Sequence, residues 1–127
     1  MLFRSYNLFL DDYRIPTDVT WEEVPRDQHY TVVRNYKEFV EIIELRGLPQ
    51  FVCYDHDLAD DHYQHSNALN DINYNKYQEK TGYHCAKWLV EYCLQKKVKH
   101  PPYVVHSLNY IGKQNIISII ESYNKSI

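Results

Sequence analysis

Three short apolar segments of the chain are each followed by polar residues that can bind metal or transfer protons. These groups are Asp11-Asp12, Asp55-His56-Asp57 and His106-Ser107. Carboxylates that converge repel one another, and a hard cation such as Mg²⁺, Mn²⁺ or Ca²⁺ relieves the repulsion through oxygen ligands. Histidine titrates near neutral pH and suits general acid–base catalysis. The three groups therefore predict a metal site flanked by proton-transfer residues, if the fold brings them together.

Each acidic pair also has a purely structural explanation. Asp11 and Asp12 can begin a turn, and Asp55 can cap a loop, as acidic residues often do. One such pair alone would favour the structural explanation. Two pairs that each end a predicted core strand favour the metal site instead. The candidate ligands are Asp11, Asp12, Asp55 and Asp57.

The elements that must position these groups follow from an alternation of strand-like and helix-like segments, which is typical of a parallel sheet covered by helices. Strands are predicted at residues 6–10, 30–34, 51–54 and 103–106, and helices at 36 to about 46, after Thr81 and after Gly112. Ligands of an open parallel sheet bind beyond the carboxyl ends of its strands. Neighbouring parallel strands would therefore bring the three polar groups to one edge.

Residues 58–80 form a long polar segment without a clear period, within what is predicted to be a single domain of residues 1–127. Long loops of this kind in compact domains are usually functional, so the segment is predicted to be a lid or insertion. Its Tyr63, Tyr74 and Tyr77 could stack on a nucleotide base or simply pack the segment onto the domain.

The bulk properties exclude several classes of function. A net charge of −3 leaves no basic surface for duplex nucleic acid, and no apolar run approaches the ~20 residues that span a bilayer. The start of the chain leaves no room for a secretion signal. Cys53, Cys85 and Cys93 have no metal-ligand spacing, and their odd number predicts reduced thiols. We therefore expect a cytoplasmic protein.

Four segments resemble, in order, the motifs of one family. They are LFLDDYRIP at 8–16, YDHDL at 54–58, TGY and AKWL within 81–89, and HSLNYIG at 106–112. These segments resemble the cyclic-phosphate-processing receiver-like family, which is related to the receiver domains of response regulators. Tyr110 stands where a proline usually follows the asparagine of the fourth motif.

The resemblance implies a receiver-like (flavodoxin-like), doubly wound and mainly parallel sheet of four to five strands with helices on both faces. It implies that Asp11 and Asp12 bind a divalent metal, Mg²⁺ or Mn²⁺, and that Asp55 corresponds to the carboxylate that receivers phosphorylate. Receivers also use a lysine at the end of a fifth strand, and no such strand is recognisable here. A phosphorelay switch is therefore disfavoured, and the resemblance implies action on a cyclic phosphate.

The same residues suit the opening of a cyclic phosphodiester. The reaction needs an activated water, a proton for the leaving alkoxide and positive charge on the phosphoryl oxygens. His106, His56 and Asp55 are the candidate catalytic residues. If the third strand continued past Asp55, His56 would point away from Asp55 and Asp57. Whether His56 faces the site therefore stays open.

Four residues are candidates for binding the phosphate itself. Ser107, Asn109 and Gly112 precede a predicted helix, whose free N–H groups and dipole favour an anion, although they could equally form a turn and a cap. Arg14 could clamp a phosphate with its planar fork or only balance the nearby carboxylates.

Three functions are consistent with this pattern. The first is a metal-dependent phosphoesterase that acts on a cyclic phosphate of a nucleotide, an RNA end or a related small molecule. The second is a non-catalytic protein that sequesters such a ligand in the same pocket. The third is a divergent receiver-type interaction domain.

Overall fold

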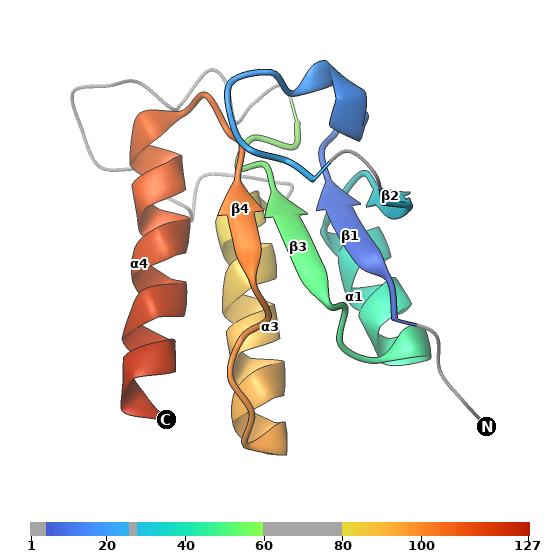
Figure 1. The fold of residues 1–127 in the computed structure, drawn as a ribbon. Coiled ribbons are helices and arrows are strands. Elements are labelled where there is room, and N and C mark those ends of the chain that lie inside the picture. The colour runs from blue at the N-terminus through green and yellow to red at the C-terminus, as the bar shows by residue number, and fades with distance from the viewer. Residues whose placement is uncertain (1–4, 26–27, 60–79) are drawn as a thin grey trace.

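The computed structural model describes residues 5–25, 28–59 and 80–127, and it shows a sheet with helices packed against it (Figure 1). Four strands, all parallel, form the sheet in the order β2-β1-β3-β4. The strands are β1 Asn7–Leu10, β2 Tyr30–Val33, β3 Phe51–Tyr54 and β4 Tyr103–Val105. The helices are α1 Tyr36–Arg46, α3 Gly82–Lys96 and α4 Tyr110–Ser126, and a 3₁₀ turn, η1, spans Pro16–Asp18. The expected parallel α/β fold is confirmed.

The predicted caps begin α1 and α3. The Asn35 side chain accepts a hydrogen bond from the Glu38 amide at 2.9 Å, and the Thr81 hydroxyl accepts one from the Tyr83 amide at 3.2 Å. Such bonds satisfy N–H groups that have no partner within the first turn of a helix. Gly47 ends α1 with a φ of 85°, a value that favours glycine.

The start of the last helix was predicted too late in the chain. The helix α4 begins at Tyr110, and Gly112 lies inside its first turn. Asn109 is the cap, because its side-chain oxygen accepts a hydrogen bond from the Gly112 amide at 3.0 Å. A glycine in a first turn reads from sequence as a break before the helix, whereas the cap bond of Asn109 starts the helix earlier.

The two faces of the sheet are covered differently. Successive residues of a strand point to opposite faces, so Leu8 and Leu10 face one side and Phe9 the other. Leu8 and Leu10 lie in a core cluster with side chains of α1, α3 and α4. Phe9 lies in a second cluster with Val19 and Val24, which belong to the β1–β2 connection.

In the described part of the chain, the three α-helices contribute to the core of a single face of the sheet. The described residues of the β1–β2 connection, 11–25 and 28–29, include those that cover the other face, Val19 and Val24. Pro16 and Pro25 interrupt this connection, because proline lacks an N–H donor and has a fixed φ. The regular structure among its described residues is the short turn η1. The segment that covers this face is thus the one that follows Asp11.

Two further expectations concern parts of the chain that bear on the site. The predicted lid or insertion at 58–80 falls almost entirely on residues 60–79, which lie outside the described residues, and so do Tyr63, Tyr74 and Tyr77. Among the described residues, no helix combines the length and apolar character that crossing a membrane requires.

Candidate functional site

Strand register brings three of the predicted residues together at one edge of the sheet. Asp11 follows β1, Asp55 follows β3 and His106 follows β4. The strand ladder extends to them, since the Asp55 amide donates to the Leu10 carbonyl at 3.0 Å and the His106 amide to the Tyr54 carbonyl at 2.9 Å. One ligand atom from each of the three side chains lies within 4.8 Å of the other two, and all three residues are buried.

Asp11 is the most heavily hydrogen-bonded member of this group. Its Oδ1 accepts from the amides of Tyr13 and Arg14, at 3.0 and 2.9 Å, and its Oδ2 accepts from Nε2 of His106 at 2.9 Å. Burial raises the pKa of Asp11, but the bond from His106 and the two backbone N–H groups outweigh burial and lower the pKa to about 2. Asp11 is therefore ionised at neutral pH.

His106 is held in place by a stacked ring and by a hydrogen bond at Nε2. The ring is fully buried and stacks on Phe9, with centroids 4.7 Å apart and planes 6° from parallel. An ionised carboxylate only accepts hydrogen bonds, so Nε2 of His106 carries the proton that reaches Asp11. Nδ1 is buried and has no hydrogen-bond partner among the described residues. This geometry resembles a histidine that orients a carboxylate.

Asp55 has an oxygen that is available for a ligand. Its Oδ1 accepts from the His56 amide at 2.9 Å, whereas its Oδ2 is buried without a hydrogen-bond partner in the part of the chain that the structure describes. Burial raises the pKa of Asp55 well above its ordinary value, and the neighbouring charges of Asp11, Asp12 and Asp57 raise it further. A cation at this position would stabilise the ionised form.

This donor set fits a divalent cation. Asp11 and Asp55 would supply the hard oxygen ligands that Mg²⁺ and Mn²⁺ prefer. His106 would orient Asp11 through its hydrogen bond to Oδ2. Asp12 lies close enough for its charge to act on Asp55 but is not in the three-residue group. Asp57 is also outside that group.

Asp57 takes part in a second network at the start of α4. Its Oδ1 lies 2.7 Å from Nδ1 of His56, and its two oxygens accept from the Asn109 side-chain amide at 3.2 and 3.3 Å. The other end of the Asn109 side chain caps α4 at Gly112. This network joins the end of β3 to the start of α4.

Gly112 and His56 are in close contact within this network. A Cβ atom built on Gly112 would lie 2.3 Å from the His56 ring, so only glycine allows α4 to pack this closely. His56 is fully buried, and Ser107 accepts a hydrogen bond from the Asn109 amide at 3.1 Å. These contacts give Asn109 and Gly112 structural roles. A role of Ser107, Asn109 or Gly112 in phosphate binding, and of His56 in catalysis, stays a prediction.

Arg14 lies beside the acidic group. Its Nη1 is 3.4 Å from Oδ2 of Asp11, and its guanidinium carbon lies over the rings of Tyr13 and Trp21, at 4.6 and 5.1 Å from their centroids. Burial lowers the pKa of Arg14, but the negative charges of Asp11 and Asp55 raise it above the ordinary value. The guanidinium is thus a fixed positive charge at the rim of the site.

Two supporting residues were missed in the sequence. The indole Nε1 of Trp21 donates to the His106 carbonyl at 2.7 Å. Nη1 of Arg34 donates to the carbonyls of Asp11 and Arg14, at 3.2 and 2.7 Å. Trp21 stands in a segment that is predicted to be a loop. A large aromatic residue in a loop was the one sequence feature that could have indicated its supporting role. Nothing in the local pattern around Arg34 indicates this role.

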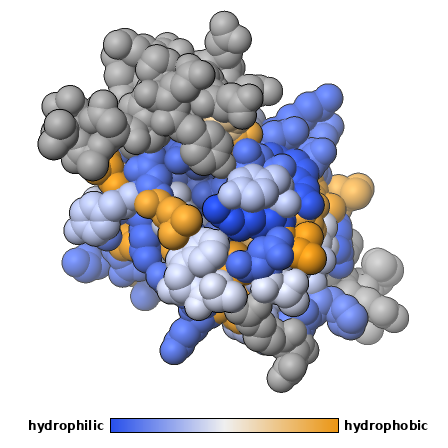
Figure 2. Space-filling model, turned by 90° about the horizontal axis from the view of Figure 1, so that it is seen from above, coloured by the Kyte–Doolittle hydropathy of each residue, from blue (hydrophilic) through white to orange (hydrophobic). Residues whose placement is uncertain are grey.

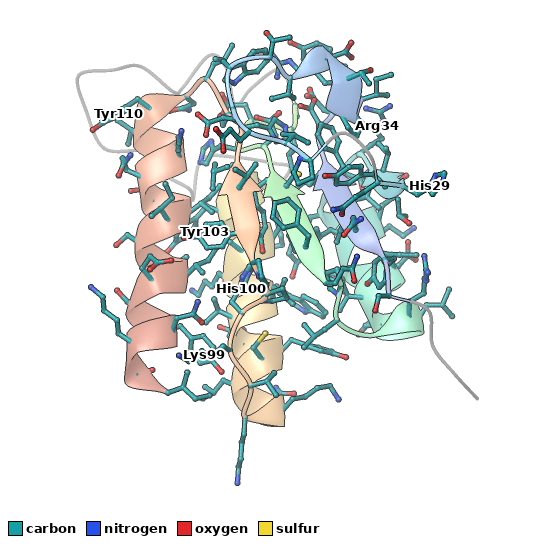
Figure 3. All side chains as sticks on the ribbon, viewed as in Figure 1. His29, Arg34, Lys99, His100, Tyr103 and Tyr110 are labelled. Carbon is teal, nitrogen blue, oxygen red and sulfur yellow. The ribbon has the colours of Figure 1, made fainter. Side chains whose placement is uncertain are left out.

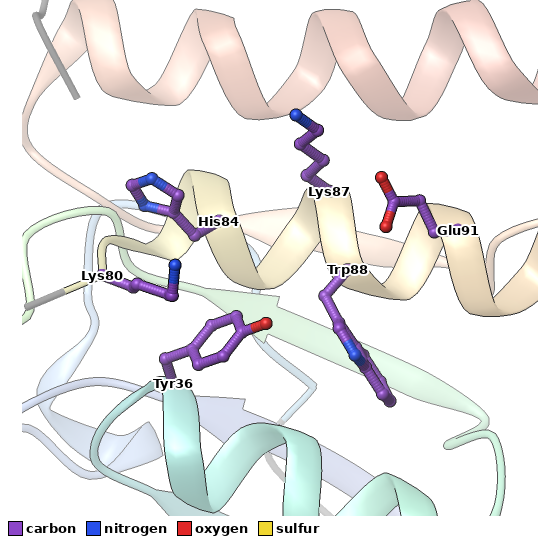
Figure 4. Close-up of a pocket in the computed structure, with 6 residues that line it drawn as sticks. All are labelled: Tyr36, Lys80, His84, Lys87, Trp88 and Glu91. Carbon is purple, nitrogen blue, oxygen red and sulfur yellow. The ribbon is translucent and has the colours of Figure 1, made fainter. Parts of the chain in front are cut away.

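A separate groove lies between α1 and α3 (Figure 4). It has a volume of about 210 Å³ and is lined by Tyr36, Lys80, His84, Lys87, Trp88 and Glu91. The Lys80 ammonium lies 5.3 Å from the centroid of the Tyr36 ring. None of these residues belongs to the Asp11–Asp55–His106 group, so the groove is not part of that site.

The comparison with known families agrees with the four sequence motifs. The model of the cyclic-phosphate processing receiver domain matches residues 6–122, which is nearly the whole chain. The chain belongs to this family. Among curated proteins and among solved structures, no match to the chain was found. In this receiver domain, Asp11, Asp55 and His106 lie together at the carboxyl ends of the strands.

Proposed function

We propose that this receiver domain opens a cyclic phosphate by hydrolysis, with a divalent cation, Mg²⁺ or Mn²⁺, held by Asp11 and Asp55. The observation that carries the proposal is the buried Oδ2 of Asp55, which has no hydrogen-bond partner among the described residues and lies in one group with the ionised Asp11. Two buried carboxylates this close together are costly without a cation. The family's association with cyclic-phosphate processing supports the choice of substrate.

The reaction converts a cyclic phosphodiester into a phosphate monoester. Water adds to phosphorus, one ring P–O bond breaks, and the departing alkoxide takes up a proton. When bound, the cation supplies Lewis-acid polarisation and neutralises charge on the phosphoryl oxygens. Arg14 binds a phosphoryl oxygen through the guanidinium N–H groups that do not face Asp11.

We assign to His106 the positioning of Asp11. Sequence reasoning placed His106 as an acid or base that exchanges a proton with the substrate. Its complete burial and the donation of its Nε2 proton to Asp11 favour the positioning role. Asp12 and Asp57 remain candidate ligands from the sequence, and Asp55 and His56 remain candidate catalytic residues.

A second candidate function is sequestration of a phosphate-bearing ligand without turnover. The complete burial of both His56 and His106 favours it, because neither imidazole is exposed to donate a proton to a leaving group. We place either activity in the cytoplasm, where the three buried and unpaired cysteines would stay reduced. A receiver-type regulatory role would instead require a stable phosphate on Asp55.

A screen of cyclic phosphates with and without Mg²⁺ or Mn²⁺ tests the proposal. Release of a monoester that depends on the metal and is lost in Asp55→Asn supports hydrolysis. Binding of the ligand with no product under any condition supports sequestration. Stable incorporation of phosphate at Asp55 from a small phosphodonor would support the regulatory role and contradict both others.

A further inference from the structure

Exposed aromatic and apolar side chains gather at the end of the molecule where the strands end. From above, this end shows apolar and weakly polar residues among the hydrophilic ones (Figure 2). Five of the large hydrophobic residues that are exposed in the described ranges lie there: Tyr13, Ile15, Trp21 and Leu108 in the connections that follow β1 and β4, and Tyr110 at the start of α4. An apolar rim around a charged site suits a ligand that is charged at one end and apolar at the other.

Tyr13 is the best-placed residue of this rim. It stands two positions after Asp11, and its backbone amide donates to Oδ1 of Asp11 at 3.0 Å. Its side chain is nevertheless 61% exposed. The ring is therefore held beside the charged group by the backbone while much of its surface faces solvent.

Further contacts hold the Tyr13 ring in place. The guanidinium carbon of Arg14 lies 4.6 Å from the centroid of the Tyr13 ring and 5.1 Å from that of Trp21. Trp21 is in turn tied to the site by its hydrogen bond to the His106 carbonyl, at 2.7 Å. A binding surface that is ordered before the ligand arrives loses less entropy on binding. The three residues form such a surface.

We infer that the phosphate this site takes belongs to a nucleoside, whose base stacks on the exposed part of the Tyr13 ring. This inference rests on the proposed function and specifies its substrate class. Every purine and pyrimidine base has a flat π-face that can stack on tyrosine, whereas a polyol phosphate has no such face. Arg14, between the acidic group and the ring, would then contact the phosphate at one end and support the stacked ring at the other.

The nucleoside phosphate has two possible sources with the same chemistry. It can be a free mononucleotide, or it can be the terminal nucleotide of an RNA strand. Both present one base and one cyclic phosphate to the site. The chain's net charge of −3 provides no general attraction for a longer polyanion, so we expect the terminal nucleotide to account for the binding in either case.

Equilibrium binding to the full chain with Mn²⁺ tests the inference. The probes are adenosine 2′,3′-cyclic phosphate and the cyclic phosphate of glycerol, which has the same five-membered phosphate ring but no base. We expect the adenosine ligand to bind about 5- to 100-fold more tightly. Tyr13→Ala should remove most of that difference, and Tyr13→Phe should keep it. Leu45→Ala is the matched control, because Leu45 is 77% exposed near the end of α1, does not belong to this rim, and should leave the difference unchanged.

The outcomes separate this inference from the proposed function. Equal binding of the two ligands by the wild-type chain, or an equal loss of both in Tyr13→Ala, would overturn the stacking alone. Binding of neither ligand would overturn the proposed function and the stacking together. A short oligoribonucleotide that ends in the same cyclic phosphate then assigns the source. Binding weaker than that of the mononucleotide supports a free nucleotide as the source, and binding at least as tight supports an RNA end.

Discussion

Nε2 of His106 lies 2.9 Å from Oδ2 of Asp11, although 95 positions separate the two residues in the chain. The contact spans β3, which lies between β1 and β4 in the sheet. It joins the side chain of the residue that follows β4 to the side chain of the residue that follows β1. The contact also explains why Asp11 stays ionised in a buried position, since His106 supplies the strongest of the bonds that lower its pKa.

Replacing His106 separates a positioning role from proton transfer. If His106 orients Asp11, His106→Ala should weaken Mn²⁺ binding by about 10- to 100-fold, with turnover falling in step. If His106 exchanges a proton with the substrate, turnover should fall by about 10²–10⁴-fold while Mn²⁺ affinity holds. Calorimetric titration together with turnover at saturating metal distinguishes the two. His106→Gln, which retains an N–H donor, should recover part of the metal affinity only in the first case.

Asp55→Asn should have opposite effects on metal binding and on stability. The substitution removes a proposed ligand, so we expect Mn²⁺ affinity to fall at least about 10-fold. The pKa of Asp55 is raised in the folded state, so its ionisation opposes folding increasingly as pH rises above the ordinary aspartate pKa. The neutral amide should therefore raise the metal-free Tm at neutral pH. Thermal unfolding with and without Mn²⁺ measures both effects.

The effects of Asp55→Asn on metal affinity and Tm should be compared with those of Asp57→Asn and Asp12→Asn. Asp57 is bonded to His56 and to the Asn109 side chain, so its replacement should lower Tm more than it lowers metal affinity. Asp12→Asn should weaken metal binding if Asp12 completes the ligand set, as the sequence predicts. Equal metal binding by wild type and Asp55→Asn would exclude Asp55 as a ligand.

Gly112→Ala should destabilise the fold through His56. The added methyl group would lie 2.3 Å from the His56 ring, so α4 or the ring must shift. Overpacking of this kind costs about 1–3 kcal/mol, which chemical denaturation can measure. The double variant Gly112→Ala with His56→Ala should lose less stability than the two single variants combined. Strict additivity would mean that the contact does not limit the packing of α4.

The stability of the protein should fall as pH decreases from about 6.5 toward 4, because of His100. This residue precedes β4, whereas His106 follows that strand, so the two histidines lie at opposite ends of β4 (Figure 3). Burial lowers its pKa to about 4, and its ring nitrogens face the Tyr54 hydroxyl at 2.7 Å and the Pro101 carbonyl at 2.6 Å. Between the folded and ordinary pKa values the unfolded chain binds more protons, so unfolding becomes easier as pH falls.

Between pH 4 and about 6.5, the free energy of unfolding should change by about 1.4 kcal/mol per pH unit because of His100. Denaturant titrations across the window measure it. His100→Gln should lose this part of the slope, and the exposed His29 provides a control, since His29→Gln should retain it. A wild-type slope that persists unchanged in His100→Gln would assign the dependence to another group.

The order of the elements and the polar groups that follow three of the strands could be predicted from the residues alone. Strand and helix signals act over a few residues, and caps such as Asn35 and Thr81 depend on local hydrogen bonds, so the pattern of residues is sufficient to place them. The acidic residues after β1 and β3 were identified for the same reason. Parallel strands have their carboxyl ends at one edge, so their convergence could be expected before any contact was known.

The contacts of each polar side chain, by contrast, depend on how distant segments pack together. Asp57 and Asp55 are two positions apart, yet one is bonded to Asn109 and the other lies with Asp11 and His106. The loop that covers Phe9, and the bond from Trp21 to His106, depend on segments that are distant in the chain. Side-chain hydrogen bonds require a fit of a few tenths of an ångström. That fit is set by how the helices and loops pack on the sheet, which no local pattern of residues encodes.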